Sequence, residues 1–188
     1  NLEPKVAATD SAADLAAAGR SDAYMNRQYL DPVFKGRYPD EFPELFGEAW
    51  PEFPSEDFRK ISQPIDFLGI NYYKRGVMRD DLTAMVERAA HVKHIPGATH
   101  TTLGWEVHAP SLTTILTWVR DRYGELPIYI TENGAAFYDP PVAEGRVVQD
   151  PLRVSYLRDH LLAIHEAMNR GVKVRGYFVW SLLDNFEW

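Results

Sequence analysis

Short apolar runs alternate along the chain with longer stretches in which apolar residues recur every three or four positions. Three runs rich in β-branched and aromatic residues predict buried strands, at residues 65–73, 127–131 and 174–180. Between them, apolar residues at i, i+3, i+4 and i+7 predict an amphipathic helix over 111–123, and a second helix is expected over 150–170. This alternation indicates an α/β fold with parallel strands and helices packed outside.

The apolar positions of the two helices define the faces that we expect to be buried. In the first helix they are Leu112, Ile115, Leu116 and Val119. In the second helix they are Leu157, Leu161, Ile164 and Met168. Glycine commonly ends a helix, so Gly124 and Gly171 mark the expected C-terminal ends of the two helices.

The first hundred residues are less regular. Residues 1–6 have the pattern of a strand tail that runs into a loop, and residues 10–30 predict a helix with a break near Gly19. Residues 31–64 hold six prolines among aromatic residues, which predicts a long irregular connection. Residues 75–102 carry charges of both signs with weak periodicity, so we expect a surface excursion that contains a hairpin or a short helix.

Length and charge narrow the class of protein. A chain of 188 residues with 45% hydrophobic residues can build one sizeable core, whereas a complete (β/α)8 TIM barrel needs roughly 250 residues. Because the predicted strands and helices supply far fewer than eight βα units, we expect about half of such a barrel. The net charge of -7 includes no basic block, so the expected partner is a small molecule, with no nucleic acid and no membrane.

The remaining composition bears on location and cofactors. The absence of cysteine excludes disulfides, thiolate zinc sites and cysteine nucleophiles, and it is compatible with a reducing compartment, so a cytoplasmic location is expected. The six histidines are scattered and lack the spacing of metal ligands. We therefore expect neither a metal site nor a cofactor.

One carboxylate lies at the end of a predicted core strand. The strand that begins at Pro127 runs directly into Glu132, Asn133 and Gly134. An ionised group at the edge of an apolar core is costly unless it is paired or hydrogen-bonded, and barrels of parallel strands build their active sites at the carboxyl ends of the strands. Glu132 is thus a candidate catalytic residue, with an ordinary solvent-facing acid as the alternative.

Three further stretches accompany the Glu132 motif, Ile130–Gly134. In chain order they are Gly69–Tyr73 and Gly104–Glu106 before it, and Trp180–Trp188 after it. Together the four stretches resemble the motifs of family 1 glycoside hydrolases, the retaining β-glucosidases and their relatives, in that family's order, and the match covers essentially the whole chain. The resemblance implies a retaining β-glycosidase that hydrolyses terminal nonreducing β-D-glycosides by double displacement.

The resemblance also implies roles at the reacting centre. Glu132 would be the nucleophile, which attacks the anomeric carbon and forms a covalent glycosyl-enzyme. Tyr73 would donate its phenolic hydrogen to that carboxylate and favour the charged form. Asn71 and Asn133 would help to orient the carboxylate or the sugar.

Other positions would bind the substrate, a β-glycoside or oligosaccharide. Trp180 would lie against the apolar face of the sugar ring. Glu187 and Trp188 would bind hydroxyls at the far end of the nonreducing sugar. Trp105 would line the wall beside the leaving group. For these aromatic residues, core packing is the alternative.

The resemblance leaves one catalytic group outside the chain. Retention requires a second carboxyl about 5 Å from the nucleophile, which the family supplies from an Asn-Glu-Pro motif after the fourth strand. Glu3 lies in a similar string, Asn-Leu-Glu-Pro, but the extra leucine aligns it better with the fifth strand, so we expect no catalytic role for it. We interpret residues 1–188 as the C-terminal half of a single catalytic domain, from the loop after strand five through strand eight, with the N-terminal half as its complementary partner.

Two other interpretations stay open. A noncatalytic half-barrel could bind sugar or a partner chain, because an open parallel sheet leaves edges and apolar faces exposed. A 6-phospho-β-glycosidase is less well supported, because the carboxylate of Glu187 would repel a phosphate dianion. The preferred glycone remains open among glucose, galactose and fucose. The 188-residue chain alone is expected to be inactive.

Overall fold

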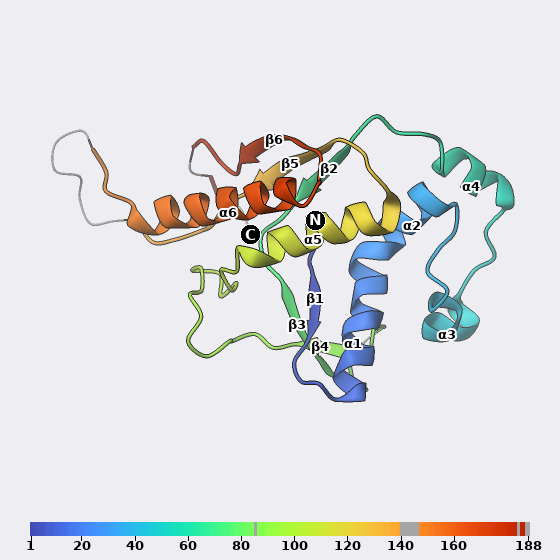
Figure 1. Ribbon diagram of the computed structural model, residues 1–188. Helices are drawn as coiled ribbons and strands as arrows, with labels where there is room; N and C mark the ends of the chain where they lie inside the picture. Colours follow the sequence, from blue (N-terminus) through green and yellow to red (C-terminus); the bar gives the residue numbers. More distant parts are fainter. Residues whose placement is uncertain (85, 140–146, 184, 187–188) are drawn as a thin grey trace. The chain divides into compact units, whose positions relative to one another are not determined.

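A computed structural model of the protein describes residues 1–84, 86–139, 147–183 and 185–186 (Figure 1). The chain forms two compact units, which are described separately. The β5 unit comprises Asn1, Phe67–Lys74 and His94–Trp188, and the β1 unit comprises Leu2–Asp66 and Arg75–Lys93. Each unit contains a three-stranded sheet with parallel pairing, so the predicted α/β class is confirmed.

The β1 unit is built on the sheet β1-β3-β4. β1 (Lys5–Ala7) pairs in parallel with β3 (Gly76–Asp80), and β3 pairs antiparallel with β4 (Ala89–His91). Of the hairpin and the short helix expected as alternatives within residues 75–102, the hairpin is therefore the one observed. Helix α1 (Ala12–Asp22) packs on β1 and β3, and its buried alanines meet Met78 in a small apolar core.

The helical segment after β1 differs from the prediction. The Ser11 hydroxyl caps α1 by accepting the backbone N–H of Asp14, and the helix continues past Gly19 without the expected break. A π-helical turn, η1 (Ala23–Arg27), then leads into α2 (Gln28–Lys35). The break was wrong because a single exposed glycine weakens a helix by only about 1 kcal/mol, which tertiary contacts readily offset.

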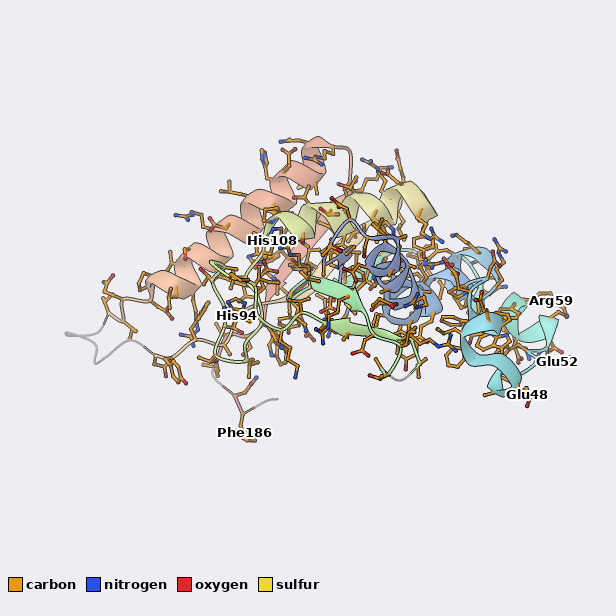
Figure 2. All side chains as sticks on the ribbon, turned by 90° about the horizontal axis from the view of Figure 1, so that it is seen from below. Glu48, Glu52, Arg59, His94, His108 and Phe186 are labelled. Atoms are coloured by element: carbon orange, nitrogen blue, oxygen red, sulfur yellow. The ribbon has the colours of Figure 1, made fainter. Side chains whose placement is uncertain are left out.

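The proline-rich segment is more ordered than expected. It contains α3 (Phe42–Phe46), the 3₁₀ turn η2 (Gly47–Ala49) and α4 (Ser55–Ile61). Prolines lie at the starts of α3 and α4, where a missing N–H costs no intrahelical bond. Aromatic rings pack together between these short helices, and they belong to Tyr38, Phe42, Phe46, Trp50, Phe53 and Phe58. Figure 2 labels Glu48, Glu52 and Arg59, whose exposed side chains lie along this segment.

The β5 unit is built on the parallel sheet β2-β5-β6. Strand β5 (Ile128–Asn133) lies in the middle, between β2 (Leu68–Asn71) and β6 (Val174–Val179). The three predicted strands are confirmed, although β5 continues through Glu132 and Asn133 instead of ending before them. All three strands therefore direct their carboxyl ends to one edge of the sheet.

Two helices of the β5 unit pack against each other, α5 (Pro110–Tyr123) and α6 (Pro151–Asn169) (Figure 1). The four apolar positions predicted for α5 are all buried. Gly124, with a φ of 90°, ends α5 as expected. The hydroxyl of Thr113 donates to the carbonyl of Ala163 at 2.8 Å, which ties the two helices together inside the unit.

The buried face of α6 differs from the predicted one. Leu161 and Met168 are 47% and 48% exposed, so these two predictions were wrong. The buried positions of α6 are Tyr156, His160, Ala163, Ile164 and Ala167. The buried face is rotated because Tyr156 and His160 have hydrogen-bond or stacking partners inside the unit. A prediction from the spacing of apolar residues does not take such polar aromatic side chains into account.

Candidate active site

A short hydrogen bond joins the ends of β2 and β5. The hydroxyl of Tyr73 donates to Oε2 of Glu132 at 2.7 Å, although the two residues are 59 positions apart. The backbone N–H of Tyr72 also donates to the Glu132 carbonyl at 2.9 Å. Because parallel strands bring their carboxyl ends together, the predicted pairing of these two side chains at one edge is observed. A hydroxyl that donates to a carboxylate forms one of the stronger hydrogen bonds available in a protein.

A cavity of about 770 Å³ lies next to Tyr73 and to Gly134, two residues after Glu132; Glu132 itself is not among the residues that line it. Tyr73 and Trp105 are on its wall, together with Trp180, which directly follows β6. The rings of Tyr73 and Trp105 meet edge to face with their centroids 5.7 Å apart, and the Lys74 ammonium lies 5.4 Å from the Trp105 ring centroid. A cavity of this size with aromatic walls suits a small ligand.

The two asparagines predicted for the site have different surroundings. Asn71 is in register with Glu132, and its amide oxygen accepts the hydroxyl of Thr131 at 2.5 Å. Asn133 is fully buried. Its amide nitrogen donates to the carbonyl of Tyr72 at 2.8 Å and to the hydroxyl of Tyr156 at 2.9 Å. The Asn133 side chain thus serves the connection between strands, and it is not among the residues that line the cavity.

Two tyrosines and a histidine complete this buried polar network, and the sequence analysis missed all three. The hydroxyl of Tyr177, on β6, donates to Oδ1 of Asn133 at 2.8 Å. His160, fully buried on α6, stacks on the ring of Tyr156 with centroids 3.9 Å apart, and its Nδ1 lies 2.8 Å from the Tyr156 carbonyl oxygen. The spacing of Tyr156 and His160, four residues apart on one helix face, is the sequence signal that could have indicated a buried pair.

Burial keeps these three groups neutral near pH 7. It raises the pKa of Tyr156 well above the ordinary tyrosine value, and it raises the pKa of Tyr177 to about 12. Burial also lowers the pKa of His160, because the charged imidazolium would lose its hydration. The tyrosines therefore act as hydrogen-bonding groups in this network and carry no charge.

Gly134 is required by a close approach of two strands. A Cβ atom at this position would lie 1.8 Å from the carbonyl oxygen of Trp180, well inside the contact distance of any two atoms. The backbone N–H of Trp180 donates to the Asn133 carbonyl at 3.0 Å, immediately beside this contact. The absence of a side chain at residue 134 thus lets Trp180 reach the cavity wall.

Other candidates lie elsewhere or outside the described residues. Glu187 and Trp188 fall outside them. Glu3 is buried in the β1 unit, where its carboxylate pairs with the ammonium of Lys5. Within the described ranges, no group of three or more His, Asp or Glu side chains is placed to hold a metal ion. No helix in the same part of the chain is long and apolar enough to cross a membrane.

A comparison with protein families identifies the group to which this arrangement belongs. The family described as glycosyl hydrolase family 1 matches residues 1–188. The chain belongs to this family. The chain is similar to the β-glucosidase of Agrobacterium sp., with 42% identity over 190 residues, and to β-glucosidase A of Acetivibrio thermocellus, with 37% identity over 190 residues.

Two solved structures have a backbone similar to that of this chain. The AHE enzyme of Alicyclobacillus herbarius matches with a TM-score of 0.90 and 45% identity, and a family 1 glycoside hydrolase of Thermotoga maritima, solved with a cyclophellitol analogue, matches with a TM-score of 0.91 and 36% identity. Each match covers 100% of this chain and 41% of the other chain. The chain likewise spans 41% of the Agrobacterium enzyme. It therefore spans less than half of the length of each of these three proteins.

Proposed function

We propose that these residues form part of a retaining β-glycosidase of the β-glucosidase type, with Glu132 as the nucleophile. The observation that carries the proposal is the hydrogen bond from Tyr73 to Glu132 at the carboxyl edge of a parallel sheet, beside a cavity large enough for a sugar. Membership of glycosyl hydrolase family 1, and similarity to enzymes named β-glucosidase, supports the reaction class.

The reaction follows from two carboxyl groups on opposite sides of the scissile bond. The Glu132 carboxylate attacks the anomeric carbon while a second carboxyl protonates the departing glycosidic oxygen, which leaves a glycosyl ester on Glu132. The second group, now a carboxylate, removes a proton from water, and that water releases the sugar with its original configuration. We propose that the second carboxyl lies about 5 Å from Glu132 and belongs to a part of the enzyme outside residues 1–188.

The remaining site residues have distinct proposed roles. Tyr73 holds the nucleophile still by its hydrogen bond. Trp180 offers an aromatic face to the apolar side of the sugar, and Trp105 lines the wall beside the leaving group. Glu187 and Trp188 bind hydroxyls of the nonreducing sugar. The Thermotoga maritima β-glucosidase, which is 36% identical, has been solved in complex with deoxynojirimycin, a finding that supports a sugar-sized ligand here.

We further propose that β2, β5 and β6 are consecutive strands of a TIM barrel, the last three of its eight. Parallel pairing in the order β2-β5-β6, with α5 and α6 as crossover helices, supports this arrangement. The complementary partner is the first half of the same barrel, which would cover apolar side chains now exposed at the end of β6.

The decisive experiment labels the nucleophile in the complete enzyme. A 2-deoxy-2-fluoro β-glucoside forms a glycosyl-enzyme that hydrolyses slowly, so peptide mapping should find one sugar on Glu132. Glu132→Gly should abolish hydrolysis, and azide should restore part of the activity by attacking the anomeric carbon from the vacated space. Glu3→Gln is the control and should retain activity. A label on another residue would contradict the proposal.

The alternative of a noncatalytic half-barrel is favoured by one observation, the exposed apolar residues at the end of β6. Hydrolysis of an aryl β-glucoside by the complete enzyme would separate the two proposals. We expect the isolated 188-residue chain to bind its partner half and to show no turnover.

A further inference from the structure

One buried amide connects the two strand ends that carry the reactive pair. Asn133 directly follows Glu132, and Tyr72 directly precedes Tyr73. The amide nitrogen of Asn133 donates to the Tyr72 carbonyl at 2.8 Å, so this bond spans the same two strands as the bond from Tyr73 to Glu132. The strand pair is irregular here, because the register shifts between Ile70 and Asn71. A side-chain bond therefore reinforces the pairing at the point where the backbone ladder is interrupted.

Two tyrosines from other elements fix the orientation of that amide. The hydroxyl of Tyr177 donates to the amide oxygen at 2.8 Å, and the hydroxyl of Tyr156 accepts from the amide nitrogen at 2.9 Å. Three polar contacts thus hold one side chain that is completely removed from water. Loss of the Tyr177 hydroxyl would remove the donor to the amide oxygen, and loss of the Tyr156 hydroxyl would leave the amide nitrogen with the Tyr72 carbonyl alone. A buried polar atom that loses its partner costs about 1–3 kcal/mol.

Packing makes this arrangement rigid. Tyr156 is 3% exposed, and the buried ring of His160 stacks on it from the next turn of α6. Burial raises the pKa of both tyrosines, so neither can change its hydrogen-bonding pattern by ionising near neutral pH. Hydrogen bonds in the low-dielectric interior of a protein are stronger than those at its surface, so their loss costs more free energy.

We propose that Tyr156 and Tyr177 are positioning residues for the nucleophile: by fixing the Asn133 amide, they hold the ends of β2 and β5 at the spacing that the bond between Tyr73 and Glu132 requires. The inference rests on the proposed function of Glu132. Neither tyrosine hydroxyl bonds to the Glu132 carboxylate in the described structure; both act through the backbone that carries it. A displacement of about 1 Å at a reacting group can cost on the order of 100-fold in rate.

The test uses the complete enzyme with Tyr156→Phe, Tyr177→Phe and a control, Tyr129→Phe. Tyr129 lies on the same strand as Glu132, and its hydroxyl makes no hydrogen bond within the described residues. We expect both network variants to lower kcat by about 10- to 100-fold and to change KM by less than about 3-fold. The rate of labelling by the 2-deoxy-2-fluoro glucoside should fall in parallel, and the control should match the parent enzyme.

A second background separates positioning from general damage to the fold. In Glu132→Gly supplied with azide, the nucleophile is a free anion that strand spacing does not position. Tyr177→Phe should therefore cost less than about 3-fold in that background. An equal loss in both backgrounds would show a merely structural role, and no loss with Glu132 intact would also overturn the inference. The parent enzyme is labelled in the same series. If its Glu132 carries the sugar, the proposed function holds and either of these two results overturns only the positioning role; if Glu132 stays unlabelled, the proposed function itself fails.

Discussion

The carbonyl oxygen of Trp180 occupies the space in which any residue other than glycine at position 134 would place its Cβ atom. The contact sits where β5 ends and the chain after β6 turns toward the cavity. Because the obstacle is backbone and not a flexible side chain, relief would require the strand ends to separate.

Gly134→Ala is therefore expected to lower the free energy of unfolding by at least about 2 kcal/mol and to reduce activity by moving Trp180. The matched control is Gly19→Ala, an exposed position inside α1 where a Cβ meets no atom within 4 Å. That change should stabilise the protein by about 0.5–1 kcal/mol, because alanine has the better helix propensity. Thermal unfolding of both variants measures the contrast, and equal effects would contradict it.

Adjacent tyrosines at the end of β2 should have opposite phenotypes. Tyr73→Phe removes the donor to Glu132, and a hydrogen bond to a charged group is worth about 1.5–3 kcal/mol, so we expect kcat/KM to fall by about 10- to 100-fold. Stability should change little, because Glu132 is only partly buried and water can replace the lost donor. Tyr72→Phe removes a bond from a buried hydroxyl to the His108 carbonyl. It should cost about 1 kcal/mol of stability and leave the chemistry nearly unchanged. Kinetics and thermal unfolding on both variants test the division of roles.

His160 should make stability depend on pH. Its folded pKa is lowered by burial, so below the ordinary histidine value of about 6.5 the unfolded chain binds more protons than the folded chain. The free energy of unfolding should then fall by about 1.4 kcal/mol per pH unit as the pH drops from about 6.5 toward the folded pKa, and it should be independent of His160 above that range.

The measurement for His160 is the slope of stability against pH. Of the neighbouring charges, Asp159 opposes the shift and His108 adds to it, but both matter less than burial. His160→Gln should remove the contribution whatever its effect on absolute stability. His165→Gln, at an exposed position on the same helix, should leave the slope intact. A slope that survives His160→Gln would assign it to another group.

The 188-residue chain on its own should associate. Large apolar side chains are exposed near the carboxyl end of β6, among them Phe178 at 56%, Leu182 at 94% and Leu183 at 77%. Several exposed apolar side chains within a few residues of one another favour self-association or binding of a complementary chain. Sedimentation should show species that grow with concentration, and the separately produced remainder of the enzyme should reverse the growth. A stable monomer at all concentrations would contradict this expectation.

The sequence predicted the parts of the fold that local pattern determines. Apolar spacing gave α5 and its buried face correctly, because Leu112 and its neighbours are buried for hydrophobicity alone. The same reasoning failed for α6, where Tyr156 and His160 are buried through partners on other elements. The pairing of β1 with β3 joins residues about seventy positions apart, and no local signal indicates it.

The sequence likewise predicted part of the candidate site and missed the rest. Glu132 and Tyr73 were placed together because both end parallel strands, and their contact is observed. Asn133 was expected to help orient the carboxylate or the sugar, and that role stays a prediction. Its side chain joins a network that includes Tyr177, which the sequence analysis did not single out. Hydrogen bonds between side chains from three elements depend on the tertiary arrangement, so residue type alone cannot reveal them.

The amide of Asn133 limits how this site could be moved to another protein. Grafting Glu132 and Tyr73 onto two strands of another protein would copy this hydrogen-bonded pair without the Asn133 amide that links the two strand ends. The smallest portable unit includes the Tyr72 carbonyl, the amide, and the two tyrosine hydroxyls delivered by a third strand and a helix. The pair of Tyr73 and Glu132 is therefore not transferable by itself: its geometry depends on the three strands β2, β5 and β6 and on helix α6, and engineering would have to transfer these elements together.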